Sequence, residues 1–148
     1  MQVIGIIGGG QLGRMMALDA KRMGYDVIVL DPVEHSPCGQ VADEQIVASY
    51  DDLAAIEELG RRSDIVTYEF ENVPTACPRR LAQHVPVYPP PASLDVSQAR
   101  LPAKQLIGRL STATTPYAAA EPRAALDPAG PPPGFPPLRK TRATGSPR

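Results

Sequence analysis

Two short polar segments have residue types and spacings that suit ligand binding, and the first is rich in glycine. Residues 8–13 read G-G-G-Q-L-G and match the pattern G-x-G-x-x-G. Glycines in this pattern allow a tight turn and let backbone N–H groups approach an anion at the start of a helix. Gln11 and Arg14 add an amide and a guanidinium, which suit hydrogen bonding to a phosphorylated substrate. The segment therefore predicts a site for a polar ligand.

The glycine-rich segment is open to two further interpretations. Asp31 lies 18 residues past Gly13 at the end of an apolar run, where dinucleotide-binding folds place the acid that binds a ribose. A dinucleotide such as NAD would fit this spacing. Alternatively, the glycines serve only to let a helix pack close to a sheet. Residue types alone do not choose between these two interpretations.

The second polar segment, Y-E-F-E-N-V at residues 68–73, follows an apolar run that predicts a central strand. In open parallel sheets, ligands bind outside the carboxyl ends of the strands. We expect Glu69 and Glu71 to point the same way along an extended segment, with Asn72 opposite or on the turn. These carboxylates could hold an amine or ribose hydroxyls, or one of them could cap the helix after Pro74. We favour a ligand site, because both polar segments are predicted at the same edge of the sheet.

Alternating strands and helices are predicted to position these segments. Strands are predicted at residues 3–7, 27–30, 45–47, 65–68 and 85–88, the last one at an edge or terminus because it contains a proline. Helices are predicted at residues 12–23, where Leu12, Met15, Met16, Ala20 and Met23 recur at helical spacing, at 51–62 and at 74–83. Crossover helices between strands imply a parallel sheet. The predicted fold class is therefore α/β, with a Rossmann-like parallel sheet and flanking helices.

The remainder of the chain has a different composition. Residues 89–91 are three prolines and predict a linker, and residues 97–110 predict a helix with Pro102 in its first turns. Prolines are frequent from Glu121 onward, so we predict no packed domain there.

Composition and charge exclude several classes of protein. Lys and Arg number 15 against 16 Asp and Glu, and this balance argues against a nucleic-acid binder. No apolar run is long enough for a membrane span, and the start of the chain lacks the features of a signal peptide. Cys38 and Cys77 form no C-x-x-C pair, so neither a disulfide framework nor a zinc site is predicted. We expect a cytoplasmic protein that contacts neither nucleic acid nor membranes.

Two longer motifs resemble a known enzyme family. I-G-I-I-G-G-G-Q-L-G-R-M at residues 4–15 and T-Y-E-F-E-N-V-P at 67–74 closely resemble 5-(carboxyamino)imidazole ribonucleotide synthases, which are ATP-grasp enzymes of de novo purine synthesis. The resemblance continues through residues 97–104 and returns faintly at 134–142. It implies a pre-ATP-grasp domain over residues 1–96. It also implies that residues 97–148 are the incomplete, proline-rich start of an ATP-grasp domain with a poorly ordered tail.

The resemblance also implies an activity and its residues. In this family, ATP phosphorylates bicarbonate to carboxyphosphate, and the amine of 5-aminoimidazole ribonucleotide then captures the carboxyl group as a carbamate. ATP and Mg²⁺ are the implied cofactors, and the implied assembly is a homodimer. The residues implied to line the aminoimidazole nucleotide pocket are Gly10, Gln11, Leu12, Glu71 and Asn72. Arg100 and Lys140 match ATP-contacting positions.

The sequence departs from the family after Lys140. The family's glycine-rich loop over the phosphates does not follow Arg142, and the later carboxylates and asparagine that ligate magnesium are also missing, so no metal ligand is assigned to this chain. Phosphoryl transfer depends on these groups. We therefore expect an N-terminal fragment that is inactive alone. Two alternatives are a fragment of an NAD(P)-dependent oxidoreductase and a noncatalytic nucleotide-binding module.

Overall fold

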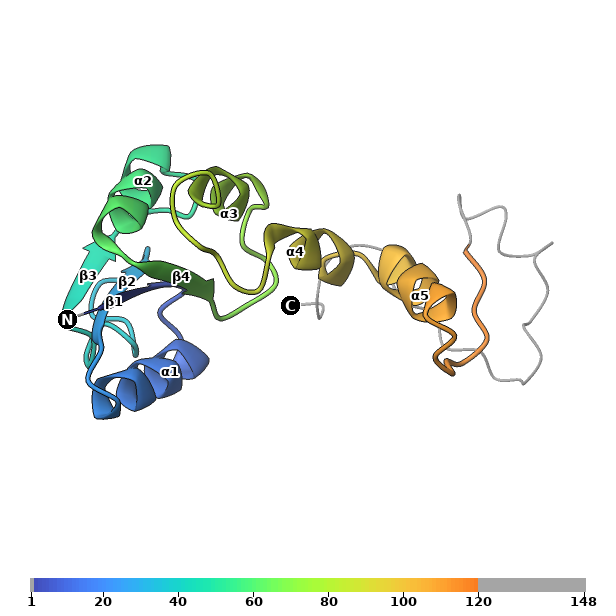
Figure 1. The fold of residues 1–148 in the computed structure, drawn as a ribbon, viewed down its shortest axis with the longest axis horizontal. Coiled ribbons are helices and arrows are strands. Elements are labelled where there is room, and N and C mark those ends of the chain that lie inside the picture. The colour runs from blue at the N-terminus through green and yellow to red at the C-terminus, as the bar shows by residue number, and fades with distance from the viewer. Residues whose placement is uncertain (1, 120–148) are drawn as a thin grey trace. The chain divides into compact units, whose positions relative to one another are not determined.

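The computed structural model describes residues 2–119. The chain divides into two units, Met1–Asp95 and Val96–Arg148. The first unit alternates strands and helices (Figure 1). The strands are β1 (Val3–Ile7), β2 (Asp26–Asp31), β3 (Glu44–Val47) and β4 (Ile65–Tyr68). The helices are α1 (Gln11–Arg22), α2 (Leu53–Arg62), α3 (Ala76–Leu81), α4 (Pro91–Ser97), which crosses the boundary between the units, and α5 (Arg100–Arg109) in the second unit.

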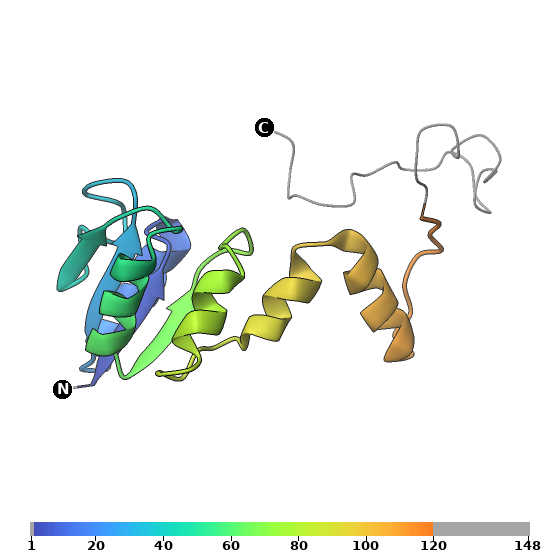
Figure 2. The same cartoon turned by 90° about the horizontal axis from the view of Figure 1, so that it is seen from above.

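The four strands form one parallel sheet in the order β3-β2-β1-β4. Gly5 of β1 pairs with Ile28 of β2 on one side and with Val66 of β4 on the other. Helix α1 covers one face, while α2 and α3 cover the other (Figures 1 and 2). The predicted α/β fold with a parallel sheet and flanking helices is confirmed for this unit. Within residues 2–119, no helix is both long and apolar enough to cross a membrane.

Strand β4 is the last strand in the sheet order, so its predicted central position was wrong. The segment 85–88, predicted as a strand, makes only an isolated parallel bridge between Val87 and Val66. The Val66 N–H donates to Pro86 O at 2.9 Å, and the Tyr88 N–H donates to Val66 O at 2.9 Å. The pairing goes no further, because the next donors in this register would be Pro86 and Pro90, which have no N–H.

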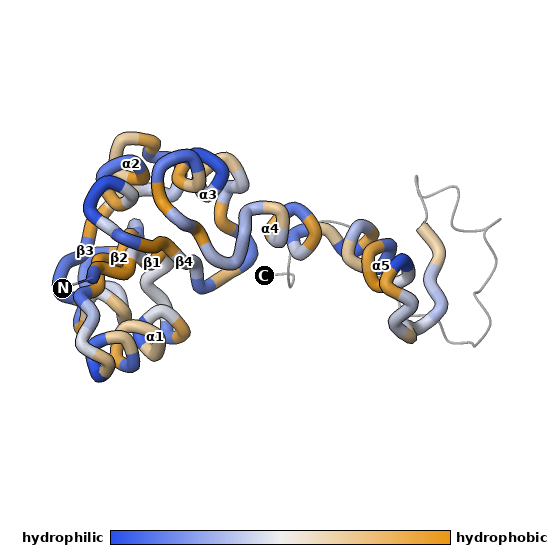
Figure 3. The backbone as a smooth tube through the Cα atoms, in the orientation of Figure 1, coloured by the Kyte–Doolittle hydropathy of each residue, from blue (hydrophilic) through white to orange (hydrophobic). Residues whose placement is uncertain are grey.

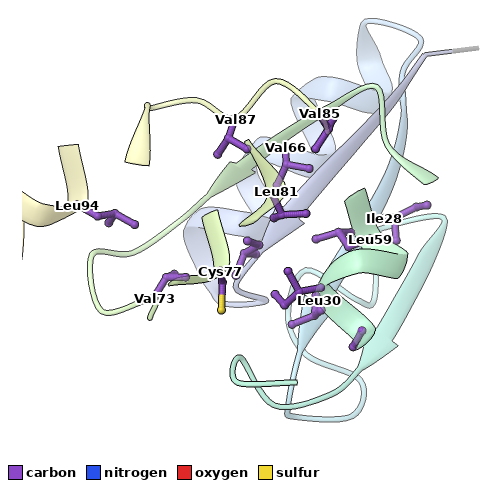
Figure 4. Packing of buried hydrophobic residues seen from close by; sticks show 13 residues of the cluster. Ile28, Leu30, Leu59, Val66, Val73, Cys77, Leu81, Val85, Val87 and Leu94 are labelled. Atoms are coloured by element: carbon purple, nitrogen blue, oxygen red, sulfur yellow. The ribbon is translucent and has the colours of Figure 1, made fainter. Parts of the chain in front are cut away.

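The sheet buries both of its faces, and adjacent strand residues therefore belong to different cores. Ile6 and Val29 pack with the small side chains of α1, while Ile7 and Leu30 pack with α2 and α3. Figure 4 shows the second, larger cluster, where side chains of α2 and α3 meet the strands. Figure 3 shows hydrophobic stretches along the strands. Burial on both faces is typical of parallel sheets, whose strands are continuous apolar runs.

Helix α1 faces the sheet with its smallest side chains. Its buried residues are Gly13, Ala17 and Ala20, whereas Leu12 and Met15 are each 61% exposed. The apolar spacing predicted the helix correctly, but most of the large residues that form it face outward. The small residues face the sheet because α1 lies very close to it: a Cβ added to Gly13 would lie 2.6 Å from the backbone oxygen of Gly8.

Two helices near the end of the described chain differ from the sequence prediction. Pro91 begins α4 instead of continuing a linker, and a proline is well tolerated at a first helical position. Leu94 of this helix is buried against the larger core. The helix predicted from residue 97 begins only at Arg100, because Ala99 is extended with φ −129°. No residue of α5 is buried. The proline-rich segment from residue 121 lies outside the described residues.

Candidate functional site

The two polar segments of the sequence meet at one edge of the sheet. Strands β1 and β4 are parallel neighbours, and their last paired residues are Ile7 and Tyr68. The Glu69 N–H continues this pairing by donating to Ile7 O at 3.1 Å. The glycine-rich segment and residues 69–73 therefore leave the sheet side by side, as the sequence predicted.

Glu69 occupies the anion position at the start of α1. Its Oε1 accepts from the Gly10 N–H at 2.7 Å, and its Oε2 accepts from the Gly13 N–H at 2.5 Å. Gly10, the N-cap residue, has no side chain to cap the helix, so a carboxylate 59 positions later caps it instead. A negative charge here is stabilised by the helix dipole and by the N–H donors. The glycines make room for this carboxylate, since a Cβ on Gly10 would lie 2.5 Å from Glu69 Oε1.

Asp31 closes the loop from the side of β2. This buried carboxylate accepts from the Gly9 N–H at 2.6 Å, the Val33 N–H at 2.8 Å and the Tyr50 hydroxyl at 2.7 Å. Burial and the hydrogen bond to Asp31 raise the pKa of Tyr50, so its hydroxyl stays protonated as the donor. The Tyr50 ring also packs on Phe70, with the ring centroids 5.2 Å apart. Asp31 is thus engaged within the protein and is not presented to a ribose.

These two carboxylates argue against the dinucleotide interpretation. A pyrophosphate at this loop would need the N–H groups of Gly10 and Gly13, which Glu69 already uses. It would also lie against the negative charge of that side chain. The alternative of an NAD(P)-dependent oxidoreductase therefore does not fit the geometry of the loop.

The segment after β2 forms the outer wall of the loop. The Cys38 N–H donates to Gly9 O at 2.8 Å, and burial raises the pKa of the Cys38 thiol to about 11, aided by the charges of Glu69 and Asp31. Arg14 Nη1 donates to Pro37 O at 3.0 Å and to the Gln40 side chain at 2.9 Å. Arg14 therefore ties this wall to α1, and the expectation that its guanidinium binds a ligand is not supported.

Two N–H groups at the start of α1 are not used by the carboxylates of Glu69 and Asp31. Among the described residues, no hydrogen-bond acceptor is present for the backbone N–H groups of Gln11 and Leu12. Both residues are exposed. The first turn of a helix leaves such donors without helical partners. The N–H groups of Gly9, Gly10 and Gly13 thus bind the protein's own carboxylates, whereas Gln11 and Leu12 belong to the exposed part of the loop.

The structure places the other predicted site residues as follows. Glu71 and Asn72 are exposed on the turn that follows β4, so the predicted extended conformation was wrong, and Glu71 is more exposed than Glu69. Arg100 is exposed at the first residue of α5, in the second unit. Lys140 lies outside the described residues. Within residues 2–119, no group of three or more His, Cys, Asp or Glu side chains could hold a metal ion.

Sequence reasoning missed the residues that close the loop. Tyr50 and Cys38 carried no motif, and Glu69 was expected to face a ligand together with Glu71. One signal was available: three consecutive glycines need neighbours that approach closely. A Cβ on Gly9 would lie 2.8 Å from the Asp31 Cβ, and a Cβ on Gly8 would lie 2.5 Å from the Glu69 Cγ.

Fold and loop together define a Rossmann-like domain whose glycine-rich loop is closed by its own carboxylates. A family model described as the ribonucleotide synthetase preATP-grasp domain matches residues 1–98. The chain belongs to this family.

The resemblance to 5-(carboxyamino)imidazole ribonucleotide synthases is also confirmed. The N5-carboxyaminoimidazole ribonucleotide synthase of Brucella melitensis is 52% identical over 114 residues, which are 77% of this chain and 32% of that protein. The Bacillus subtilis enzyme of the same name is 51% identical over 117 residues, covering 78% of this chain and 30% of its own length. The chain thus spans about a third of the length of these curated relatives.

Solved structures of the same enzyme share the fold. The synthetase from Thermotoga maritima superposes with a TM-score of 0.88 at 40% identity, covering 98% of this chain and 40% of that one. The enzyme from Aspergillus clavatus, solved with ADP and 5-aminoimidazole ribonucleotide, gives a TM-score of 0.68 at 31% identity, over 74% of this chain and 29% of that one.

Proposed function

We propose that this chain supplies the part of an N5-carboxyaminoimidazole ribonucleotide synthase that holds 5-aminoimidazole ribonucleotide. The complete reaction transfers the γ-phosphoryl group of ATP to bicarbonate, which gives carboxyphosphate and ADP. The exocyclic amine of the ribonucleotide then attacks the carboxyl carbon, and phosphate leaves. ATP is the proposed cofactor together with Mg²⁺, whose ligands we do not assign to this chain.

The observation that supports this proposal is that the segment after β4 meets the start of α1, through the hydrogen bonds of Glu69 to Gly10 and Gly13. Strands β1 and β4 are parallel neighbours, and the exposed Gln11 and Leu12 follow β1 as the exposed Glu71 and Asn72 follow β4, so we expect these four residues to share one edge of the sheet. Donors on one side and oxygen acceptors on the other suit a ligand with ribose hydroxyls and an amine. Gly10 contributes the backbone turn. Both motifs involved also carry the family resemblance.

We assign the remaining chemistry to residues outside this edge. Arg100 and Lys140 are the proposed ATP contacts, on the basis of the resemblance alone. A homodimer and a cytoplasmic location are proposed on the same basis. The chain alone should not hydrolyse ATP in a bicarbonate-dependent manner, since charge stabilisation during phosphoryl transfer needs metal and positioned cations. Robust turnover by the 148-residue chain would contradict this expectation.

The binding role can be tested by following backbone amide signals of the chain during titration with 5-aminoimidazole ribonucleotide. We expect shifts at Gln11, Leu12, Glu71 and Asn72. The variant N72A should weaken binding, whereas E34Q, which alters an exposed carboxylate that pairs with His35, should not. Equal shifts with ribose 5-phosphate would favour the noncatalytic nucleotide-binding module. Micromolar binding of NADH at the same amides would overturn the proposal.

A further inference from the structure

Glu69 stands out because it fills a place that a ligand could otherwise take. Its carboxylate is partly buried and accepts from two N–H groups of the α1 start, at 2.7 and 2.5 Å. The positive end of the helix is therefore compensated from within the protein. The N–H groups of Gln11 and Leu12 lie between these two donors in the chain, in the same helix turn that holds the negative charge of Glu69.

We propose that Glu69 is a specificity-determining residue, because its carboxylate makes the start of α1 reject phosphate and leaves the Gln11 and Leu12 donors for an uncharged acceptor of the ligand. A phosphate at these donors would lie beside a fixed carboxylate, and like charges in such proximity are costly. A ribose hydroxyl or a ring nitrogen meets no such repulsion. The loop thus binds the neutral part of a ribonucleotide, while its phosphate lies elsewhere.

Local geometry holds Glu69 in this position. The Glu69 N–H donates to Ile7 O at 3.1 Å, which fixes the backbone at the end of β4. A Cβ on Gly8 would lie 2.5 Å from the Glu69 Cγ, so only a glycine at this position leaves room for the Glu69 side chain. Gly8 itself has φ +103°, a conformation that favours glycine. The glycines of the loop therefore leave room for the carboxylate of Glu69, as glycines in other such loops leave room for a bound anion.

The test uses inorganic phosphate as the probe, titrated into the 148-residue chain while the Gln11 and Leu12 amide signals are observed. We expect no saturable shift for the unaltered protein at millimolar phosphate. The variant E69Q removes the charge but keeps the side-chain size, and should bind phosphate at these amides about tenfold more tightly. The matched control E34Q removes one exposed carboxylate and should behave like the unaltered protein.

Two results would overturn the inference: phosphate binding at these amides in the unaltered chain, or no gain in E69Q. A second variant, E69A, leaves a space of carboxylate size lined by the Gly10 and Gly13 N–H groups. Formate should raise the Tm of E69A but not that of E69Q, where the side chain still fills the space. A carboxylate that merely stabilised the fold would also lower the Tm when removed, but neither E69Q nor E69A would then gain phosphate binding at the Gln11 and Leu12 amides. The inference rests on the proposed function only for the identity of the ligand, and the phosphate test fails or succeeds independently of 5-aminoimidazole ribonucleotide.

Discussion

Helices α1 and α2 begin in the same domain but are capped in different ways. At α2, the exposed Asp52 accepts from the N–H groups of Ala54 and Ala55 at 3.0 and 3.1 Å, all within one turn of chain. At α1, the N-cap residue is a glycine, and Glu69 from the end of another strand supplies the acceptor. A local cap stabilises one helix, whereas the distant cap also fastens the tip of β4 to the loop after β1.

The difference indicates where a functional edge can be built. A local cap can be replaced by any good capping residue with little effect on its surroundings. The distant cap couples the loop, β4 and the turn with Glu71 and Asn72, so a change there alters the whole edge. Four substitutions separate these two kinds of helix start, and their expected effects decrease in the order given.

The largest effect is expected from E69A. It removes two hydrogen bonds to a charged acceptor and leaves the Gly10 and Gly13 N–H groups without a partner. We expect the free energy of unfolding to fall by about 4 kcal/mol, measured by urea denaturation. The control E34A should change it by less than about 0.5 kcal/mol. A loss no larger than that of the control would mean that Glu69 does not cap α1.

The substitution G13A tests how closely α1 must approach the sheet. Its Cβ would lie 2.6 Å from Gly8 O and 3.1 Å from Glu69 Oε2, so the backbone or the cap has to move. We expect a loss of about 3 kcal/mol in the free energy of unfolding. The matched control is G108A in α5, where an added Cβ meets nothing within 4 Å and alanine is the better helix former. Similar losses for both variants would contradict the close approach.

The thiol beside the α1 start provides a pH-dependent test. Burial raises the pKa of Cys38 from 9.0 to about 11, so the unfolded chain loses this proton at lower pH than the folded one. The stability that the buried, protonated thiol contributes is complete below pH 9 and is lost between about pH 9 and 11, a loss of about 2 to 3 kcal/mol in the free energy of unfolding. The variant C38A should show a correspondingly smaller decline of unfolding free energy over this range. Parallel pH curves for the two proteins would refute the assignment.

The smallest effect is expected at the local cap. D52A removes the acceptor for two exposed N–H groups of α2, and water replaces it in part. The free energy of unfolding should fall by about 1 kcal/mol, and D52S should recover most of the loss because serine is also a good N-cap. A loss as large as that of E69A would remove the distinction between local and distant caps.

The parts of the fold with local signals were predictable from the sequence. Apolar runs located the strands, Gly24 with φ +88° ends the turn after α1, and acidic residues before Leu53 indicated the start of α2. The outward-facing side of α1 was not predictable, because both Ala17 and Met15 fit a helical repeat. Only the close approach of backbone to backbone at Gly13 selects the small side chains.

The position of the candidate site was predictable from the sequence, but which of its carboxylates faces the loop was not. Strand order brought the two polar segments together, which followed from the alternation of strands and helices. Which of Glu69 and Glu71 turns inward depends on the register of β4 against β1 and on the space above Gly8 and Gly10. No local pattern encodes that choice.

Native-state hydrogen exchange at the start of α1 tests the central claim most directly, because four successive amides are predicted to differ. The Gly10 and Gly13 amide protons should be protected by Glu69, whereas those of Gln11 and Leu12 should exchange almost as fast as in an unstructured peptide. In E69Q, the protection of Gly10 or Gly13 should decrease while that of Ala17 stays unchanged. Equal protection of all four amides in the unaltered protein would show that the carboxylate does not occupy the loop.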